Sequence, residues 1–366
     1  MRRAIWIALA ALVAATVLLG PHVAWRLARP RTLEAVIVDK TVPFRNDREH
    51  AAIPWILHAL KIQNGLGRFL DAEHDYVGFD PVSRTGRELT AADLANADLL
   101  FIADTYGVYV GDYQRPGDQA ALERSPKIYG GLSEGEARVI DAFAARGGMV
   151  IAEFNTFASP TDDGAEARLE ATFGVRWSRW VARYWPDLQD RNEVPRWVGH
   201  VYERVTGHLF DCTGGGMVLV REDRDIVVLR DGDDLRHGVV SQERAPLGAA
   251  FAFPQRGAFR YWMDVVAATD SELVYEHVLD VTPAGERKLE AHGLSRRFPA
   301  VTRRRDAWYF AGDFVDNALD LGSPEQAFVL GFRRERLACG SPTPEEEFFW
   351  GWYVPIVSRL LASRAR

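Results

Sequence analysis

The stretch GGMVIAEFNTFASP, at residues 147–160, decides the fold. It joins a glycine pair to the apolar run MVIA, and then to polar residues where the run ends. A short apolar run bounded by turn residues is typical of a fully buried strand. In open α/β sheets the binding site lies just beyond the carboxyl ends of such strands. We therefore expect Glu153, Asn155 and Thr156 to border a site for binding or chemistry.

Strands and helices alternate on the amino-terminal side of this stretch. Apolar strand candidates occur at three places, which are LEAVIV at 33–38, YVGF at 76–79 and LLFIA at 99–103. Helical patterns lie between them, and Ser133-x-x-Glu136 is a capping box that opens the helix before the glycine pair. This alternation predicts an α/β fold with a parallel sheet.

The chain beyond residue 177 is richer in strands and turns. Strand-like runs recur up to residue 281, and a hairpin is predicted around Arg304-Arg305-Asp306 before a final helix. We therefore divide the chain into four parts: an anchor and linker at 1–32, an α/β domain at 33–177, a smaller β-rich insertion at 178–297, and a segment at 298–366 that completes the α/β domain.

Composition excludes some classes of function. The 366 residues are 47% hydrophobic and 26% charged, which is typical of a folded globular protein. The formal charge of -7 provides no basic surface, so nucleic acid is not expected as a partner. Cys212 and Cys339 lack metal-site spacing, and they either form one disulfide or remain two separate thiols.

The amino terminus carries a long apolar run. Residues 4–24 are almost all apolar, and about 20 consecutive apolar residues suffice to cross a bilayer. We predict a single-pass signal anchor in the cell membrane, with the body outside the cytoplasm, because the run follows a short basic segment directly. Arginines lie on both sides of the run in nearly equal number, so the positive-inside rule hardly distinguishes the two orientations. A cleaved signal peptide is the alternative.

Several segments resemble a known superfamily. DTYG at 104–107, LEATFGVRW at 169–177 and RRRDAWYFAGDFVD at 303–316 are similar to the class I glutamine-amidotransferase-like (flavodoxin-like) superfamily. The resemblance is to its non-amidotransferase branches, such as trehalose-utilisation-type proteins and β-galactosidase trimerisation domains. It implies a flavodoxin-like sheet. The chain also resembles bacterial membrane-anchored proteins that carry DKTVP, EFNTFASPT and YFAGDF, and this second resemblance implies no function.

The chain departs from this superfamily at the nucleophile. In true glutamine amidotransferases a cysteine occupies the turn after the central strand, and here the matching residue is Glu153. The thiolate is the nucleophile in that chemistry. The departure therefore excludes glutaminase activity.

Polar side chains follow four of the predicted strands. The residues are Asp39 and Lys40, Asp104 with Tyr106, Glu153 with Asn155, and Asp313 with Asp316. Acids that share one cleft raise one another's pKa, so that one of them can act as general acid or base. We expect Glu153, Asp104 and Asp313 as catalytic residues, and Lys40, Tyr106 and Asn155 as ligand-binding residues. The alternative is that each carboxylate merely caps a helix or binds loop amides.

Arg48, Glu49 and His50 are further candidates for ligand binding. The arginine can clamp a carboxylate or sugar hydroxyls, and the histidine can shuttle protons. The same trio also suits a solvated turn at a helix start. The histidines elsewhere lack metal-motif spacing, so no metal is expected, and no motif indicates a cofactor.

Four tryptophans alternate with arginines between residues 176 and 197. Such a patch suits sugar rings and anionic glycans. Large aromatic residues usually fill a core, however, and this alternative stays open.

Three functions follow from these patterns. The first is a membrane-anchored protein without glutaminase activity that binds an envelope or secreted glycan, as an accessory of polysaccharide assembly. The second is a carboxylate-dependent glycan hydrolase that uses Glu153 with Asp104 or Asp313, and Arg48 as a clamp. The third is a structural partner that docks other membrane proteins through an apolar face at 348–353.

Overall fold

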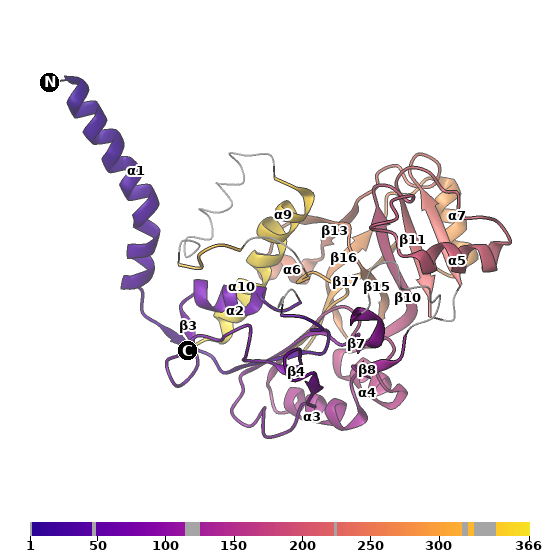
Figure 1. Cartoon of the computed structure of the whole chain (residues 1–366), viewed down its shortest axis with the longest axis horizontal. Helices are drawn as coiled ribbons and strands as arrows, with labels where there is room; N and C mark the ends of the chain where they lie inside the picture. Colours follow the sequence, from indigo (N-terminus) through magenta and orange to yellow (C-terminus); the bar gives the residue numbers. More distant parts are fainter. Residues whose placement is uncertain (1, 46–48, 114–124, 223–224, 317–320, 326–341) are drawn as a thin grey trace.

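The computed structural model describes residues 2–45, 49–113, 125–222, 225–316, 321–325 and 342–366 (Figure 1). One sheet of ten strands forms the centre of the body, in the order β14-β13-β16-β17-β18-β9-β6-β2-β4-β5. A second sheet has the order β12-β11-β10-β15, and two further sheets have two strands each. The first helix, α1, projects away from this body (Figure 1).

Five strands of the large sheet run parallel. They are β2 (Ala35–Asp39), β4 (Val77–Asp80), β6 (Leu99–Asp104), β9 (Met149–Ala152) and β18 (Ala307–Phe310). Numbered along the chain, their spatial order is 2-1-3-4-5, which is the flavodoxin-like order. The predicted parallel sheet around residues 147–160 is therefore present.

The sheet as a whole is mixed rather than parallel. The hairpin around Arg305, whose φ is 55°, reverses the chain between β17 (Arg297–Arg304) and β18. Three further strands extend the sheet antiparallel beyond β17, namely β16 (Glu272–Val278), β13 (Val240–Arg244) and β14 (Arg256–Phe259). These three strands come from residues that we expected in a separate insertion, so the large sheet continues into that region. At the other edge β5 (Thr85–Gly86) pairs antiparallel with β4.

Alternation along the parallel strands sorts their side chains onto two faces. Ile37, Phe101 and Ile151 belong to one core, which is covered by α2 (Ala52–Ala59), α9 (Pro344–Phe348) and α10 (Val354–Arg364). Their neighbours Val38, Leu100 and Val150 belong to the other core, which is covered by α3 (Glu134–Ala145) and α4 (Asp163–Phe173). The predicted capping box at Ser133 and Glu136 is present at the start of α3. Helices therefore cover both faces of the parallel strands.

The second sheet contains the predicted tryptophan patch. It consists of β10 (Val175–Trp185), β11 (Gly216–Arg221), β12 (Ile226–Arg230) and β15 (Met263–Ala268). Trp177, Trp180 and Trp185 are buried in it, the last of them near Val198 of α5 (Arg196–Thr206). Three of the four tryptophans thus form core rather than a sugar-binding surface.

The remaining elements are short. They are β1 (Arg31–Thr32), β3 (Ile62–Gln63), β7 (Val108–Tyr109), β8 (Lys127–Tyr129), the 3₁₀ turn η1 (Val110–Tyr113), α6 (Pro246–Ala250), α7 (Pro283–Ala291) and the π-helical turn η3 (Phe349–Tyr353). The aromatic residues of η3 are buried, and Trp352 packs against Phe314 and Tyr275. Phe348, the last residue of α9, is buried against Phe259. The apolar face that we expected at residues 348–353 therefore lies inside the protein and offers no docking surface.

The helix α1 (Arg2–Leu27) carries the predicted anchor. Among the described residues, no single helix is long and apolar enough to cross a membrane. Two helical segments, Ile5–Thr16 and Leu19–Leu27, meet at a bend of 44°. Taken together, they have the length and the apolar composition of a membrane span. The end of α1 is held to the body by hydrogen bonds. Trp25 Nε1 donates to the carbonyl of His58, and Lys61 Nζ donates to the carbonyls of Trp25, Arg26 and Ala28.

Candidate functional site

The order of the parallel strands reverses between β2 and β6. In open α/β sheets the ligand site lies at such a switch point, beyond the carboxyl ends of the strands. Asp39 is the last residue of β2 and Asp104 the last residue of β6, and the two are register partners. The amide of Lys40 donates to the carbonyl of Asp104, which ties the two strand ends together. The switch point is therefore lined by carboxylates.

Asp39 is held by His50, and both side chains are fully buried. The Oδ2 atom of Asp39 lies 2.5 Å from His50 Nδ1, and His50 Nε2 lies 2.7 Å from the carbonyl oxygen of Ala72. A carbonyl oxygen can only accept, so Nε2 carries a proton, and a carboxylate at Nδ1 favours a proton there too. The two side chains form a buried hydrogen-bonded pair. It fastens the chain after β2 to the sheet edge, and His50 is not exposed as the expected proton shuttle would be.

Lys40 turns away from the switch point. Its Nζ lies 2.7 Å from Glu136 Oε2 and 2.7 Å from the carbonyl oxygen of Gly131, and the side chain is almost completely buried. Burial lowers the pKa of Lys40, and the adjacent Glu136 carboxylate opposes this effect. The expected role of Lys40 in ligand binding is not supported, because its ammonium group joins β2 to α3 inside the protein.

Asp104 remains at the edge and carries an altered pKa. Its Oδ1 accepts a 2.7 Å hydrogen bond from the amide of Tyr106, whose ring packs against Tyr109. Burial raises the pKa of Asp104 to about 7, despite the hydrogen bond from the Tyr106 amide, and the nearby charge of Asp39 raises it further. A carboxyl group of this kind can exchange a proton near neutral pH.

Glu153 is a structural anchor. Its Oε2 accepts hydrogen bonds from the amides of Phe314 and Val315, at 3.2 and 3.0 Å. Its Oε1 lies 2.7 Å from the hydroxyl of Tyr353, and the side chain has no exposed surface. Burial raises the pKa of Glu153 to about 8, against the effect of these hydrogen bonds. A catalytic role for Glu153 is not supported, because no substrate can reach its carboxyl group.

Asn155 shapes the turn after β9. It has a φ of 69°, its amide donates to Asp264 Oδ2, and its carbonyl accepts from the hydroxyl of Thr105. Asn155 is mostly buried, with 9% of its surface exposed. Asp264, which the sequence did not single out, is fully buried beside the hydroxyl of Tyr309, and burial raises its pKa to about 6. No local pattern marks this residue, because it lies near the start of an otherwise apolar strand, β15.

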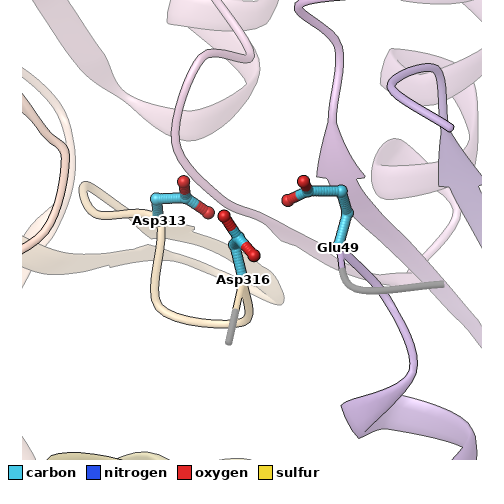
Figure 2. Close-up of side chains that lie close together, drawn as sticks. All are labelled: Glu49, Asp313 and Asp316. Atoms are coloured by element: carbon cyan, nitrogen blue, oxygen red, sulfur yellow. The ribbon is translucent and has the colours of Figure 1, made fainter. Parts of the chain in front are cut away.

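Three further carboxylates meet in front of the switch point. Figure 2 shows Glu49 facing Asp313 and Asp316, which follow β18. One oxygen from each residue lies within 4.8 Å of one oxygen of each of the others. Glu49 and Asp313 were predicted as site residues, and Asp316 joins them. Arg48, the predicted clamp, lies outside the described residues.

Electrostatic coupling connects these three residues with the strand ends. Burial raises the pKa of Glu49 well above its usual value, and the charges of Asp313 and Asp316 raise it further. Smaller effects of the same sign come from Asp104 and Asp39. These five residues, Asp39, Glu49, Asp104, Asp313 and Asp316, are called the acidic cluster below.

A cavity of about 490 Å³ lies over β4 and β5. Its lining is polar and includes Arg45, Glu73, His74, Asp80 and Arg87. Tyr76 also lines it, and the ring of Tyr76 packs against that of His50, with 4.8 Å between ring centroids. The cavity is thus separated by one aromatic ring from the pair of His50 and Asp39.

Comparisons with known proteins assign no family. No family model matches the chain, and no curated protein matches it in sequence. Solved structures that are similar in shape include a glutamine amidotransferase from Thermotoga maritima, with 10% identity, a TM-score of 0.39 and coverage of 91% of this chain and 97% of that chain. A ThuA-like protein from Bacteroides uniformis has 12% identity, a TM-score of 0.33 and coverage of 82% and 90%.

A β-galactosidase from Bacillus circulans is also similar, with 11% identity and a TM-score of 0.35. The match covers 83% of this chain but 31% of the β-galactosidase chain. The first two proteins belong to the group that the sequence resembles. At these TM-scores the likenesses carry no argument about activity, and the strand order given above describes the fold.

Proposed function

We propose that this chain is a membrane-tethered protein that binds a hydroxyl-rich ligand of the glycan class at the acidic cluster. The observation that carries the proposal is the convergence of five carboxylates at the switch point of the sheet. The switch point is where ligands bind in folds of this order. The proposal includes a class I glutamine-amidotransferase-like fold, supported by the strand order 2-1-3-4-5 with helices on both faces.

The chemistry of the cluster supports a ligand that donates hydrogen bonds. Carboxylate oxygens accept charge-assisted hydrogen bonds, and sugar hydroxyls are suitable donors. The cavity over β4 and β5 adds cationic side chains, carboxylates and the ring of Tyr76 close to the same edge. A small number of polar groups around an aromatic wall is a common arrangement for polar ligands.

The position of Cys212 supports a function without a thiol nucleophile. Cys212 is buried near Val198 and Trp185, in the core of the second sheet. The turn after β9 carries Glu153 where an amidotransferase has its cysteine, and Glu153 is bonded to backbone amides. Cys339 lies outside the described residues.

A second candidate function is carboxylate-dependent hydrolysis of the same class of ligand. The observation that favours it is the raised pKa of Asp104, about 7, beside ionisable neighbours. Asp104 would act as the general acid, in place of the buried Glu153. Paired glycosidase carboxyl groups lie about 5–5.5 Å or about 6.5–9.5 Å apart. Oxygen atoms of Glu49, Asp313 and Asp316 lie within 4.8 Å of one another, so these carboxylates share one site, and binding is the function that this convergence supports.

The membrane tether rests on the exposed apolar surface of α1. Ile5, Trp6 and Ile7 are each at least 60% exposed, and further apolar side chains are exposed up to Leu27. A surface of this kind is stable in a bilayer and not in water. We place the body outside the cytoplasm, where envelope glycans are found.

The test is a glycan array probed with the purified chain. We expect binding to a subset of glycans, and we expect Asp104→Asn to weaken that binding at least tenfold. Glu290→Gln is the control, because Glu290 is exposed on α7 and lies outside the acidic cluster. Release of free sugar from the bound glycans would favour the hydrolase, and absence of binding to every glycan would contradict the proposal.

A further inference from the structure

We propose that Glu49, Asp313 and Asp316 together bind a hard divalent cation of the Ca²⁺ class. The proposal concerns the site of the proposed function and goes beyond it by naming a bound ion. It rests on the position of that site, but not on glycan binding.

The spacing of the three carboxylates matches one ion. Ca²⁺ binds oxygen ligands at about 2.3–2.6 Å, so oxygens on opposite sides of the ion lie about 4.6–5.2 Å apart. One oxygen each from Glu49, Asp313 and Asp316 lies within 4.8 Å of the others. A single ion between them therefore reaches all three oxygens with little movement of the chain.

An unpaired buried oxygen provides a second, independent indication of a ligand. The Oε2 atom of Glu49 is shielded from solvent and has no hydrogen-bond partner among the described residues. Figure 2 shows this carboxyl group directed toward Asp313 and Asp316. A buried carboxyl oxygen without a hydrogen-bond partner is unfavourable. A cation between the three residues supplies the missing partner.

The surroundings select a hard cation. The nearby strand-end acids, Asp39 and Asp104, add negative charge and further oxygen atoms. His50 is occupied, because both of its ring nitrogens already lie against Asp39 and Ala72. A donor set made of carboxylate oxygens favours Ca²⁺, Mg²⁺ or Mn²⁺ over Zn²⁺ and Cu²⁺.

The loop that carries two of the ligands is held in place before any ion binds. Glu153 accepts the amides of Phe314 and Val315, which lie between Asp313 and Asp316. The amide of Asp313 also donates to the carbonyl of Trp262 at 2.9 Å. A site whose ligands are positioned by buried contacts loses less conformational entropy on binding.

The test is calorimetric titration of Ca²⁺, Mg²⁺ and Mn²⁺ into the chelator-treated full chain in detergent at pH 7.5. We expect one Ca²⁺ per chain, and at least tenfold weaker binding in Glu49→Gln and in Asp316→Asn. The control Glu290→Gln should bind as the unchanged protein does. Circular dichroism of each variant shows whether it is folded.

Two results would overturn the proposal. One is no heat with any of the three ions in the unchanged protein, which would mean that protons or another part of the chain balance the cluster. The other is Ca²⁺ binding that is the same in folded Glu49→Gln and Asp316→Asn. Glycan binding measured with Ca²⁺ and with chelator separates the two proposals. If the protein binds glycan but binds none of the three ions, the cation proposal alone is contradicted. If it binds Ca²⁺ but no glycan, the proposed function alone is contradicted.

Discussion

Glu153 shows how one residue can be placed correctly and assigned the wrong role. The sequence puts it at the end of the central strand, and the structure does the same. Its burial depends on Tyr353, which is 200 residues away in the chain. A contact over such a distance leaves no mark in the local pattern, so the sequence could not distinguish an anchor from a catalytic acid.

The pKa of Glu153 leads to a prediction about stability and pH. The folded value of about 8 lies above the unfolded value of about 4.3, so the folded protein binds this proton more tightly. Its contribution to the free energy of unfolding is complete below pH 4. It falls as the pH rises from about 4 to about 8, by at most about 1.4 kcal/mol per pH unit.

In the unchanged protein Glu153 accepts from the amides of Phe314 and Val315 and from the hydroxyl of Tyr353. Glutamine is neutral like the protonated carboxyl group, its oxygen can keep the two amide hydrogen bonds, and its NH₂ group then faces the Tyr353 oxygen as a donor. We expect Glu153→Gln to flatten the fall in stability between pH 5 and pH 8, so that the variant gains stability relative to the unchanged protein as the pH rises. Urea denaturation at several pH values measures this difference. A difference between the two proteins that stays constant across this range would show that Glu153 is ionised in the folded state.

Lys40 and Glu136 belong to the scale of elements, because they join the end of β2 to the start of α3. Glu136 Oε2 accepts from Lys40 Nζ and from the amide of Ser133, and Glu136 Oε1 accepts from the amide of Leu89. Removing one partner of a buried ion pair leaves an uncompensated charge and costs about 3–5 kcal/mol.

We expect Lys40→Met to destabilise the fold by this amount. The double variant Lys40→Met with Glu136→Gln should lose less than the sum of the two single changes, because neither charge is then left alone. Denaturant titration of the four proteins completes the cycle. Strict additivity of the two single changes would mean that the pair is not coupled.

For the elements, sequence patterns predicted where strands occur better than they predicted which strands pair with each other. The runs that become β2, β6 and β9 are apolar and bounded by polar turns, and each was predicted. The run that becomes β16 was also predicted, yet it joins the large sheet rather than a separate one. Its partner β13 has the sequence VSQER, which contains no apolar run and was not predicted. Strand propensity describes a half-buried surface and carries no information about which strand lies next to it.

The same limit applies to the acidic cluster. Asp39 and Asp104 could be predicted together, because parallel strands end at one edge of the sheet. Glu49 and Asp316 reach the cluster from loops, whose paths depend on contacts such as His50 with Asp39. The alternation of side chains along β2 also could not predict the direction of the Lys40 side chain, because Lys40 follows the last residue of that strand.

At the scale of the whole molecule, α1 differs from the body in the number of apolar side chains that it exposes. The apolar side chains of α1 are exposed up to Leu27, whereas Trp25 packs against Phe69 and His58 of the body. We expect a chain that lacks residues 2–22 to be soluble and to keep its melting temperature, because Trp25 and its contacts remain. The full chain should fractionate with membranes and resist carbonate extraction. Recovery of the full chain in the soluble fraction would contradict the membrane tether.

The arrangement of the whole molecule separates Glu153, an anchoring acid, from the acidic cluster that we propose as the binding site. The most direct test compares the affinity of one array-selected glycan for the unchanged protein, Glu49→Gln and Glu153→Gln, each confirmed as folded. We predict at least tenfold weaker binding for Glu49→Gln and an affinity within about twofold for Glu153→Gln, a spread below about 0.5 kcal/mol. Loss of binding in Glu153→Gln with retention in Glu49→Gln would contradict the account, because it would place the ligand at the central strand turn and not at the acidic cluster.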